Sequence, residues 1–208
     1  TSNQDNRLLF RNTLFSSEGM KNYIGGVILY DETIKQSINS KTIPEIIMEN
    51  NSIPGIKVDI GAKILAGSQE EKITEGLDGL RERLKEYNKL GARFTKWRGV
   101  YSISEKYPSK LSIHTNAHAL ARYSSIVQEC GMVPIVEPEV LMDGDHEAEK
   151  CFEVTSEVLE KCFEELIIHK VDLTGIILKP NMILDGSNAK KKIESENVAD
   201  LTLKCLKK

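Results

Sequence analysis

The sequence predicts an α/β fold of the TIM (β/α)8 barrel class, of which about five βα units lie within these 208 residues. Short runs rich in Ile and Val alternate with longer segments of helical periodicity, a pattern typical of βαβ units and a parallel sheet. Charged side chains come at the ends of several apolar runs, and barrel proteins assemble their sites at the carboxyl ends of different strands. The sequence has no GxGxxG turn, which disfavours an open dinucleotide-binding sheet.

Five apolar runs are the predicted strands: residues 24–30, 54–59, 93–98, 132–137 and 174–179. Helical periodicity follows at residues 74–87, where Leu77, Leu80 and Leu84 form one stripe, and at residues 116–130 and 146–169. A further helix is expected to start near Ser195, with the serine hydroxyl as its cap. Since no Pro-rich linker or low-complexity block divides the sequence, we expect a single domain over residues 1–208.

Composition excludes several classes of function. The 28 basic and 31 acidic residues give a net charge of -3, so no overall field favours nucleic acid or an anionic membrane. No apolar run reaches 18 residues, and the first residues lack the pattern of a signal peptide. The four cysteines contain no CxxC pair, which favours reduced, free thiols. We therefore predict a cytoplasmic protein that binds neither nucleic acid nor membranes.

Six charged residues at the predicted strand ends are the candidate site. They are Lys57, Lys96, Arg98, Glu137, Glu139 and Lys179. Charges at the ends of apolar strands are costly unless they are paired or have a task, and a phosphate-bearing substrate would supply one. Lys96 and Arg98 alternate with Trp97, so both should point into the barrel while Trp97 packs outward. Lys57 and Glu139, taken alone, are explained equally well as the first solvated residues of loops.

Lys179 and Glu137 are the two candidates whose neighbours in the sequence point most specifically to a chemical role. The run before Lys179 is apolar and Pro180 follows it, which predicts an amine at the rim of a dry pocket, activated as a nucleophile by desolvation and neighbouring cations. Glu137 lies between Pro134 and Pro138 after an apolar run, where burial and nearby cations would suit it to move protons. A buried salt bridge to one of the lysines is compatible with that role.

Metal chemistry is the main alternative for polarising a carbonyl. His114 and His118 are four residues apart and could share a helix face, but no Glu follows the first His and the sequence offers no third ligand nearby. His169 is expected at a helix end, where it favours the helix dipole. We predict neither a metal nor a cofactor.

Six strings, in order and spacing, closely resemble class I fructose-bisphosphate aldolases over nearly all of the chain: GIKVD, GLDGL, FTKWR, NAHALARY, VPIVEPEVLMDGDH and ILKPNM. The resemblance implies a lyase of glycolysis and gluconeogenesis that reversibly cleaves fructose 1,6-bisphosphate to dihydroxyacetone phosphate and glyceraldehyde 3-phosphate. By the family's pattern, Lys179 matches the Schiff-base lysine and Glu137 the general acid/base. Lys96 and Glu139 match the supporting charged network, and Lys57 and Arg98 match cations near the C6 phosphate.

The resemblance also implies parts outside these residues. The family's first barrel strand, with an aspartate, would precede Thr1, and its last two strands and tail would follow Lys208, so the domain is expected to be incomplete and inactive alone. Family members are typically homotetramers, and some dock cytoskeletal proteins or adhesin tails. A truncated, inactive binding scaffold is therefore the alternative hypothesis, whereas a transaldolase is disfavoured by the continuous match. The choice between fructose 1,6-bisphosphate and fructose 1-phosphate stays open.

Overall fold

A computed structural model describes residues 3–68 and 70–208. Five parallel strands form its central sheet in the order β1-β4-β7-β8-β9. Their bounds are β1 (Gly26–Leu29), β4 (Ile53–Lys57), β7 (Phe94–Tyr101), β8 (Val133–Val140) and β9 (Ile177–Leu178). All five predicted strands are present, and successive strands are neighbours in the sheet, as expected for consecutive βα units. The parallel α/β fold is thus confirmed.

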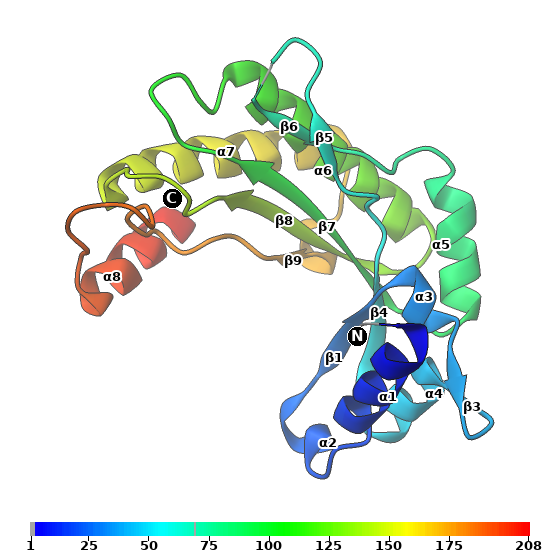
Figure 1. Cartoon of the computed structure of the whole chain (residues 1–208). Helices are drawn as coiled ribbons and strands as arrows, with labels where there is room; N and C mark the ends of the chain where they lie inside the picture. Colours follow the sequence, from blue (N-terminus) through cyan, green and yellow to red (C-terminus); the bar gives the residue numbers. More distant parts are fainter. Residues whose placement is uncertain (1–2, 69) are drawn as a thin grey trace.

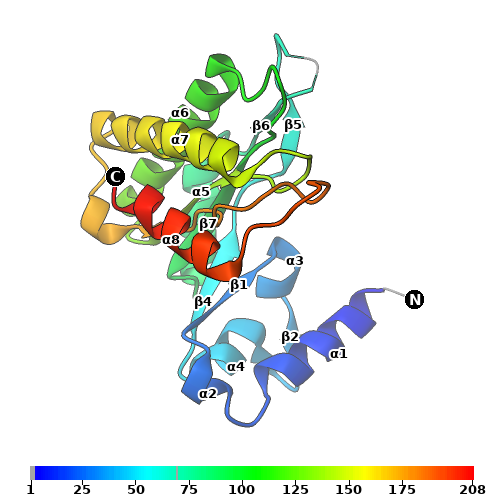
Figure 2. The same cartoon turned by 90° about the vertical axis from the view of Figure 1, so that its left-hand side faces the viewer.

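The sheet is curved and open (Figure 1). Helices α5 (Leu80–Lys89), α6 (Lys110–Glu129) and α7 (Ala148–Ile168) lie along its convex side, and α8 (Ser195–Leu206) packs against α7 (Figure 2). Strands β1 and β9 are the two edges, so the described residues form part of a curved sheet and no closed barrel. The concave side carries the charged residues of β4, β7 and β8.

Shorter elements fill the connections. They are α1 (Gln4–Phe15), α2 (Met20–Tyr23), α3 (Asp31–Ile34), α4 (Ile43–Glu49), η1 (Leu173–Gly175), and the hairpins of β2 (Ser37–Ile38) with β3 (Lys41–Thr42) and β5 (Ala62–Ile64) with β6 (Lys72–Thr74). The helices before residue 50 were not predicted. The signal for α4 was present, because Thr42 and Glu45 form a capping box, with Thr42 Oγ1 accepting from the Glu45 amide and the Glu45 carboxylate accepting from the Thr42 amide.

Two predicted helix starts and one predicted cap are wrong. The helix placed at residues 74–87 begins at Leu80, because Lys72–Thr74 pairs in the β5–β6 hairpin. The helix placed at 116 begins at Lys110, where Ser109 caps it by accepting a hydrogen bond from the Ser112 amide. The last helix starts at Ser195, as predicted, but the capping position belongs to Glu194 and no side chain caps it. The helix at 146–169 is confirmed within two residues as α7.

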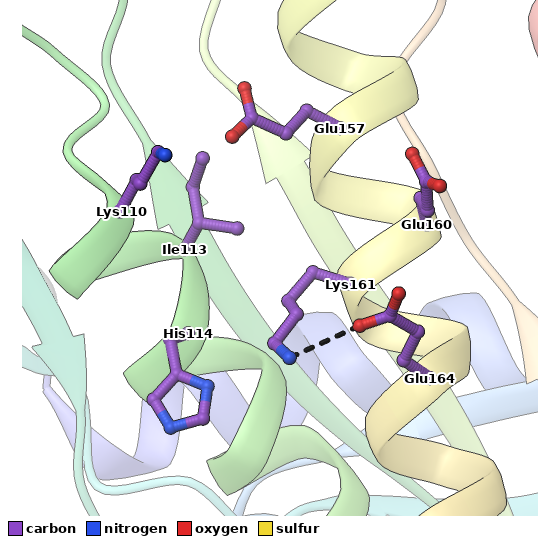
Figure 3. A pocket seen from close by; sticks show the side chains of 7 residues that line it. All are labelled: Lys110, Ile113, His114, Glu157, Glu160, Lys161 and Glu164. Carbon is purple, nitrogen blue, oxygen red and sulfur yellow. Dashed lines mark hydrogen bonds and ion pairs between the residues drawn. The ribbon is translucent and has the colours of Figure 1, made fainter.

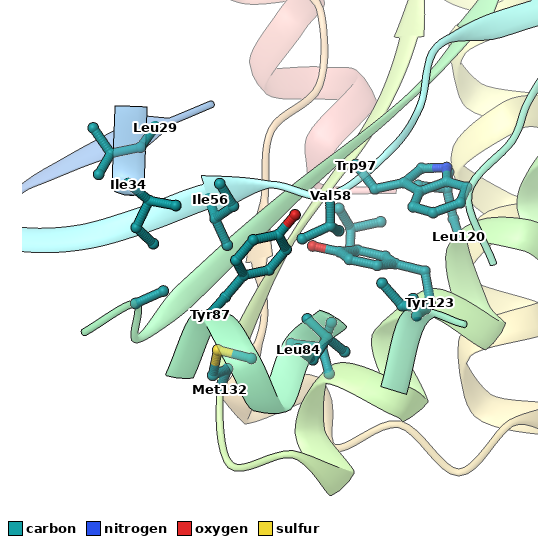
Figure 4. Close-up of a cluster of buried hydrophobic side chains, with 14 of the residues drawn as sticks. Leu29, Ile34, Ile56, Val58, Leu84, Tyr87, Trp97, Leu120, Tyr123 and Met132 are labelled. Carbon is teal, nitrogen blue, oxygen red and sulfur yellow. The ribbon is translucent and has the colours of Figure 1, made fainter. Parts of the chain in front are cut away.

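The core joins the sheet to the helices on its convex side. Trp97 is fully buried and its ring centroid lies 5.4 Å from that of Tyr123 on α6 (Figure 4). The Tyr123 hydroxyl lies 2.6 Å from Thr95 Oγ1 and donates to the Ile135 carbonyl at 3.2 Å, so this buried phenol is fully bonded. The prediction that Trp97 packs outward is confirmed. This packing fixes the face of β7 that Lys96 and Arg98 present to the concave side.

All four cysteines are free thiols, and Cys151, Cys162 and Cys205 are buried. Within the two described ranges, no helix has both the length and the apolar character that crossing a membrane requires.

Candidate active site

Five of the six predicted residues line one pocket of about 520 Å³ on the concave side of the sheet. They are Lys57, Lys96, Arg98, Glu137 and Lys179. The parallel register explains the grouping, because Lys57 lies beside Lys96 and Arg98 lies beside Glu137 on adjacent strands. The sixth residue, Glu139, follows Glu137 on the same face of β8 and contacts Arg98.

Glu137 is at the centre of the group, between two lysines. Its side chain is only 5% exposed. Lys179 Nζ donates to Oε1 of Glu137, and Lys96 Nζ lies 2.8 Å from Oε2. The two carboxylate oxygens therefore each face an ammonium group. A proton shared between Glu137 and Lys179 needs no rearrangement to move from one to the other.

Two opposing effects set the acidity of Glu137. Burial raises the pKa of the carboxyl group, whereas hydrogen bonds from Lys179 and Lys96 and their positive charges lower it. The effect of the two lysines is larger than that of burial, so the pKa of Glu137 lies below its ordinary value. The carboxylate is therefore ionised at neutral pH and can accept a proton.

Lys57 is the last residue of β4 and has a partner that the sequence reasoning missed. Its Nζ lies 2.5 Å from Oδ1 of Asp59 and donates to the Asp59 carbonyl oxygen at 2.9 Å. The Asp59 side chain is 4% exposed. The spacing of Lys57 and Asp59 in GIKVD could have predicted this pair, since residues two apart on an extended chain share a face.

Arg98 and Glu137 lie inside their strands, although both were predicted at strand ends. The pairing of β7 with β8 continues to Tyr101 and Val140, three residues beyond the predicted ends of both strands. Arg98 Nε donates to Glu139, which raises the pKa of the arginine. This pair is partly exposed, with 42% of the Arg98 side chain and 30% of that of Glu139 accessible. Lys96 pairs with Glu137, which fits the expected salt bridge between this carboxylate and one of the lysines.

Lys179 was predicted as the last residue of a strand at 174–179; β9 is shorter, Lys179 follows its last residue directly, and the Lys179 backbone N–H donates to the Val136 carbonyl at 2.8 Å. Its side chain is 55% exposed, so the expected dry pocket is wrong for the described residues. The physical reason is that β9 is an edge strand, with no further described strand beside it.

Asn181 is a second residue that the sequence reasoning missed. Its Oδ1 accepts from the Val140 amide at 2.9 Å, and its Nδ2 donates to Thr155 Oγ1 on α7 at 3.1 Å. The amide thus ties the chain after Lys179 to both β8 and α7. Because β9 is only two residues long, this tie helps to hold Lys179 opposite Glu137.

Comparisons with known proteins agree with one another. The family model described as fructose-bisphosphate aldolase class-I matches residues 1–208. The protein named "Probable fructose-bisphosphate aldolase class 1" of Xanthomonas campestris pv. campestris is 48% identical over 98% of this chain and 61% of its own length. "Fructose-bisphosphate aldolase 4, cytosolic" of Arabidopsis thaliana is 47% identical over 99% of this chain and 52% of its own. The chain thus spans little more than half the length of such relatives.

A solved structure is similar over the same part. It is the fructose-bisphosphate aldolase of Plasmodium falciparum, in complex with TRAP and a small molecule inhibitor. The TM-score is 0.95 and the identity 45%, over 97% of this chain and 59% of that one.

Proposed function

This chain belongs to the class-I fructose-bisphosphate aldolase family, and from that membership we propose that the protein reversibly cleaves fructose 1,6-bisphosphate. The products are dihydroxyacetone phosphate and glyceraldehyde 3-phosphate, the reaction is an aldol cleavage, and Lys179 forms a Schiff base with the substrate. The observation that carries the proposal is the contact of Lys179 Nζ with a buried carboxylate, Glu137, which Lys96 holds from the other side.

In the proposed mechanism, Glu137 takes a proton from Lys179, and the neutral amine attacks the C2 carbonyl of the sugar. The new N–C bond turns the carbonyl oxygen into a hydroxyl group. Glu137 then gives its proton to that hydroxyl, which leaves as water, and a protonated imine remains. Glu137, ionised again, takes the proton of the C4 hydroxyl, C4 becomes the aldehyde carbonyl, the C3–C4 bond breaks, and its electrons move to the imine nitrogen to form an enamine. Protonation at C3 and hydrolysis return the free lysine.

The charges of the pocket fit an anionic substrate. Four cationic groups, Lys57, Lys96, Arg98 and Lys179, face three carboxylates, those of Asp59, Glu137 and Glu139. One positive charge is therefore left over, in a chain whose net charge is -3. We propose that Lys57 and Arg98 bind the C6 phosphate, exchanging their present carboxylate partners for phosphate oxygens.

Covalent trapping tests the Schiff base. Borohydride reduction in the presence of dihydroxyacetone phosphate should add one substrate residue to the protein, at Lys179 in the peptide map. Lys179→Met should prevent the adduct and abolish cleavage, whereas Lys89→Met, a change at the end of α5 and outside the pocket, should leave both intact. An adduct on another lysine, or none in a protein that cleaves the sugar, would overturn the assignment.

A second candidate function rests on the Plasmodium relative, whose structure contains TRAP. The adhesin-tail partner predicted from the sequence is of this kind, and we propose that the protein can dock such a tail independently of catalysis; a cytoskeletal partner is proposed on the resemblance alone. Binding that survives Lys179→Met would support a separate docking surface. Binding lost together with cleavage would place the tail at the active site.

Location and assembly are proposals too. The relatives named cytosolic favour a cytoplasmic protein, and the family pattern favours a homotetramer. Sedimentation equilibrium measures the assembly, and a monomer would contradict it.

A further inference from the structure

A cluster of three histidines and a buried glutamate lies between α6 and α7, on the convex side of the sheet and away from the pocket just described. His114 and His118 are four residues apart on α6, and Glu165 and His169 are four apart at the end of α7. Side chains at this spacing share a helix face. Because α6 and α7 pack side by side (Figure 2), the two pairs face each other. The sequence reasoning noted the first pair and found no third ligand, which the fold supplies.

Glu165 is the centre of this cluster. Its side chain is 5% exposed, and its Oε2 lies 3.0 Å from Nδ1 of His118 and 3.8 Å from Nδ1 of His169. The other oxygen, Oε1, lies 3.4 Å from Nδ1 of His114 and 3.6 Å from Lys161 Nζ. A buried carboxylate needs compensation. The ammonium group of Lys161 alone would balance the charge of Glu165, yet three imidazole rings lie against this carboxylate as well.

The donor set has the composition of a metal site, and its ligand atoms lie close together. One ligand atom from each of His118, Glu165 and His169 lies within 4.8 Å of the other two. Tetrahedral zinc with bonds of about 2.05 Å needs ligand atoms about 3.3 Å apart. Metal binding therefore requires side-chain rotations that bring the ligand atoms together by up to about 1.5 Å. Two imidazoles and one carboxylate are a donor set that zinc uses, with a water completing the tetrahedron.

The orientation of His169 favours a ligand. Its Nδ1 lies 2.8 Å from the Glu165 carbonyl oxygen, which can only accept, so Nδ1 carries the proton and Nε2 keeps its lone pair. A backbone carbonyl that holds the other ring nitrogen is the usual support of a metal-bound histidine. The rings of His118 and His169 are 4.8 Å apart and meet edge to face, so both reach the same space.

An acidic pocket adjoins the cluster and offers a path for a cation. This pocket of about 300 Å³ lies between α6 and α7, and His114 is part of its wall (Figure 3). Three glutamates of α7 and two lysines also line it: Glu157, Glu160, Glu164, Lys110 and Lys161. Lys161 is itself paired with Glu164 at 3.1 Å. Together with Glu165, four carboxylates face two ammonium groups here, a balance that attracts cations.

We propose that His118, Glu165 and His169 form a binding site for a divalent transition metal of the zinc type, which links α6 to the end of α7. The cation takes the place of the proton between Nδ1 of His118 and Glu165, and that proton moves to Nε2 of the same ring, so the bound imidazole stays neutral. His114 keeps its contact with the second carboxylate oxygen and positions Glu165. The site is structural, since it lies on the opposite side of the sheet from Lys179 and Glu137.

Titration calorimetry with Zn²⁺ tests the site directly. The metal-free protein should take up one Zn²⁺ per chain, and His118→Asn and His169→Asn should each weaken that binding by at least about tenfold, the smallest loss typical even of an outer-shell change. Both histidines are partly exposed, so both variants should fold. His146→Asn is the matched control, because His146 lies in the loop before α7 and outside the cluster.

Co²⁺ identifies the ligands by absorption. Bound to two imidazoles and a carboxylate, it should give visible d–d bands without a thiolate charge-transfer band, and His118→Asn should remove them. Several results would overturn the proposal: no uptake of Zn²⁺, equal affinity in both histidine variants and the control, or a thiolate band that assigns the metal to a cysteine. Retained binding in the control with loss in both histidine variants supports it.

Discussion

Replacing Glu137 by Gln should damage both the stability and the activity of this protein. The carboxylate is 5% exposed and meets two ammonium groups. An amide offers only one acceptor atom, and its NH2 group must then point at the second ammonium. Lys179 is 55% exposed and can turn to water, but Lys96 is only 14% exposed and loses its counter-ion. The free energy of unfolding should fall by about 1.5–3 kcal/mol, the range for one hydrogen bond to a charged group.

Urea unfolding measures that loss at neutral pH, with Glu129→Gln as the control. Glu129 pairs with Arg81, but both side chains are about half exposed, so its loss should change stability by less than about 1 kcal/mol. In a folded Glu137→Gln protein, the proposed cleavage of fructose 1,6-bisphosphate should fall by about 10²–10⁴-fold, the usual contribution of an acid/base group. Equal stability of the two variants, or unchanged cleavage in Glu137→Gln, would refute the reasoning.

The same variant carries a pH signature. Because the pKa of Glu137 is lowered in the folded protein from its ordinary value of 4.5, its ionised form stabilises the fold above that pH. The stabilisation is lost as the pH falls through the lower, folded value. Wild type and Glu137→Gln should therefore differ most at neutral pH and converge in acid. A gap that stays constant from neutral to strongly acid pH would assign the loss to packing.

Three further changes have expected outcomes. Tyr123→Phe removes a buried hydroxyl that lies 2.6 Å from Thr95 Oγ1, and should lower the free energy of unfolding in urea by about 1–3 kcal/mol. An unchanged free energy of unfolding would mean that water takes the place of the lost hydroxyl. Hydrogen bonds from Arg7 and Arg11 of α1 lower the pKa of Glu32 to about 2, so Glu32 should stay ionised and paired with α1 as the pH falls from 4.5 to about 2. The melting temperature should therefore resist acid over this range, and Glu32→Gln should remove that resistance. Gly186→Ala would place a Cβ 2.4 Å from the Gly144 carbonyl oxygen, and should cost about 1–3 kcal/mol in unfolding free energy because backbone must shift; an unchanged melting temperature would contradict that crowding.

The strands could be predicted because each carries its own signal. Five apolar runs with few competing patterns gave five strands in the right order, and alternation around Trp97 gave the correct faces of β7. Element ends were less predictable, because they depend on a neighbour. Strand β7 runs on to Tyr101 only because β8 continues beside it, and β6 replaces a predicted helical turn only because β5 pairs with it.

The sequence predicted the charged residues of the site better than it predicted which of them form ion pairs. Strand ends predicted which residues gather, but which carboxylate faces which lysine depends on the register between strands, which the sequence does not give. The sequence could therefore predict a salt bridge between Glu137 and one of the lysines but not which one, and Glu137 is found between Lys96 and Lys179. The histidine cluster was harder to predict from the sequence than the pocket. Glu165 follows His118 by 47 residues, and only the packing of α6 on α7 brings them to 3.0 Å.

The pairing at the centre of the pocket has a consequence for how the proposed enzyme must work. Lys179 Nζ donates to Glu137, and a lysine must give up a proton before its nitrogen can attack a carbonyl. The low pKa of Glu137 also makes it a reluctant proton acceptor while both lysines remain beside it. If the C1 phosphate, which Lys57 and Arg98 do not bind in this proposal, draws Lys96 away, one of the two cations that lower this pKa is removed and Glu137 becomes a stronger base toward Lys179. Substrate charge would then activate the nucleophile, so analogues without phosphate should form the Schiff base slowly even where they bind.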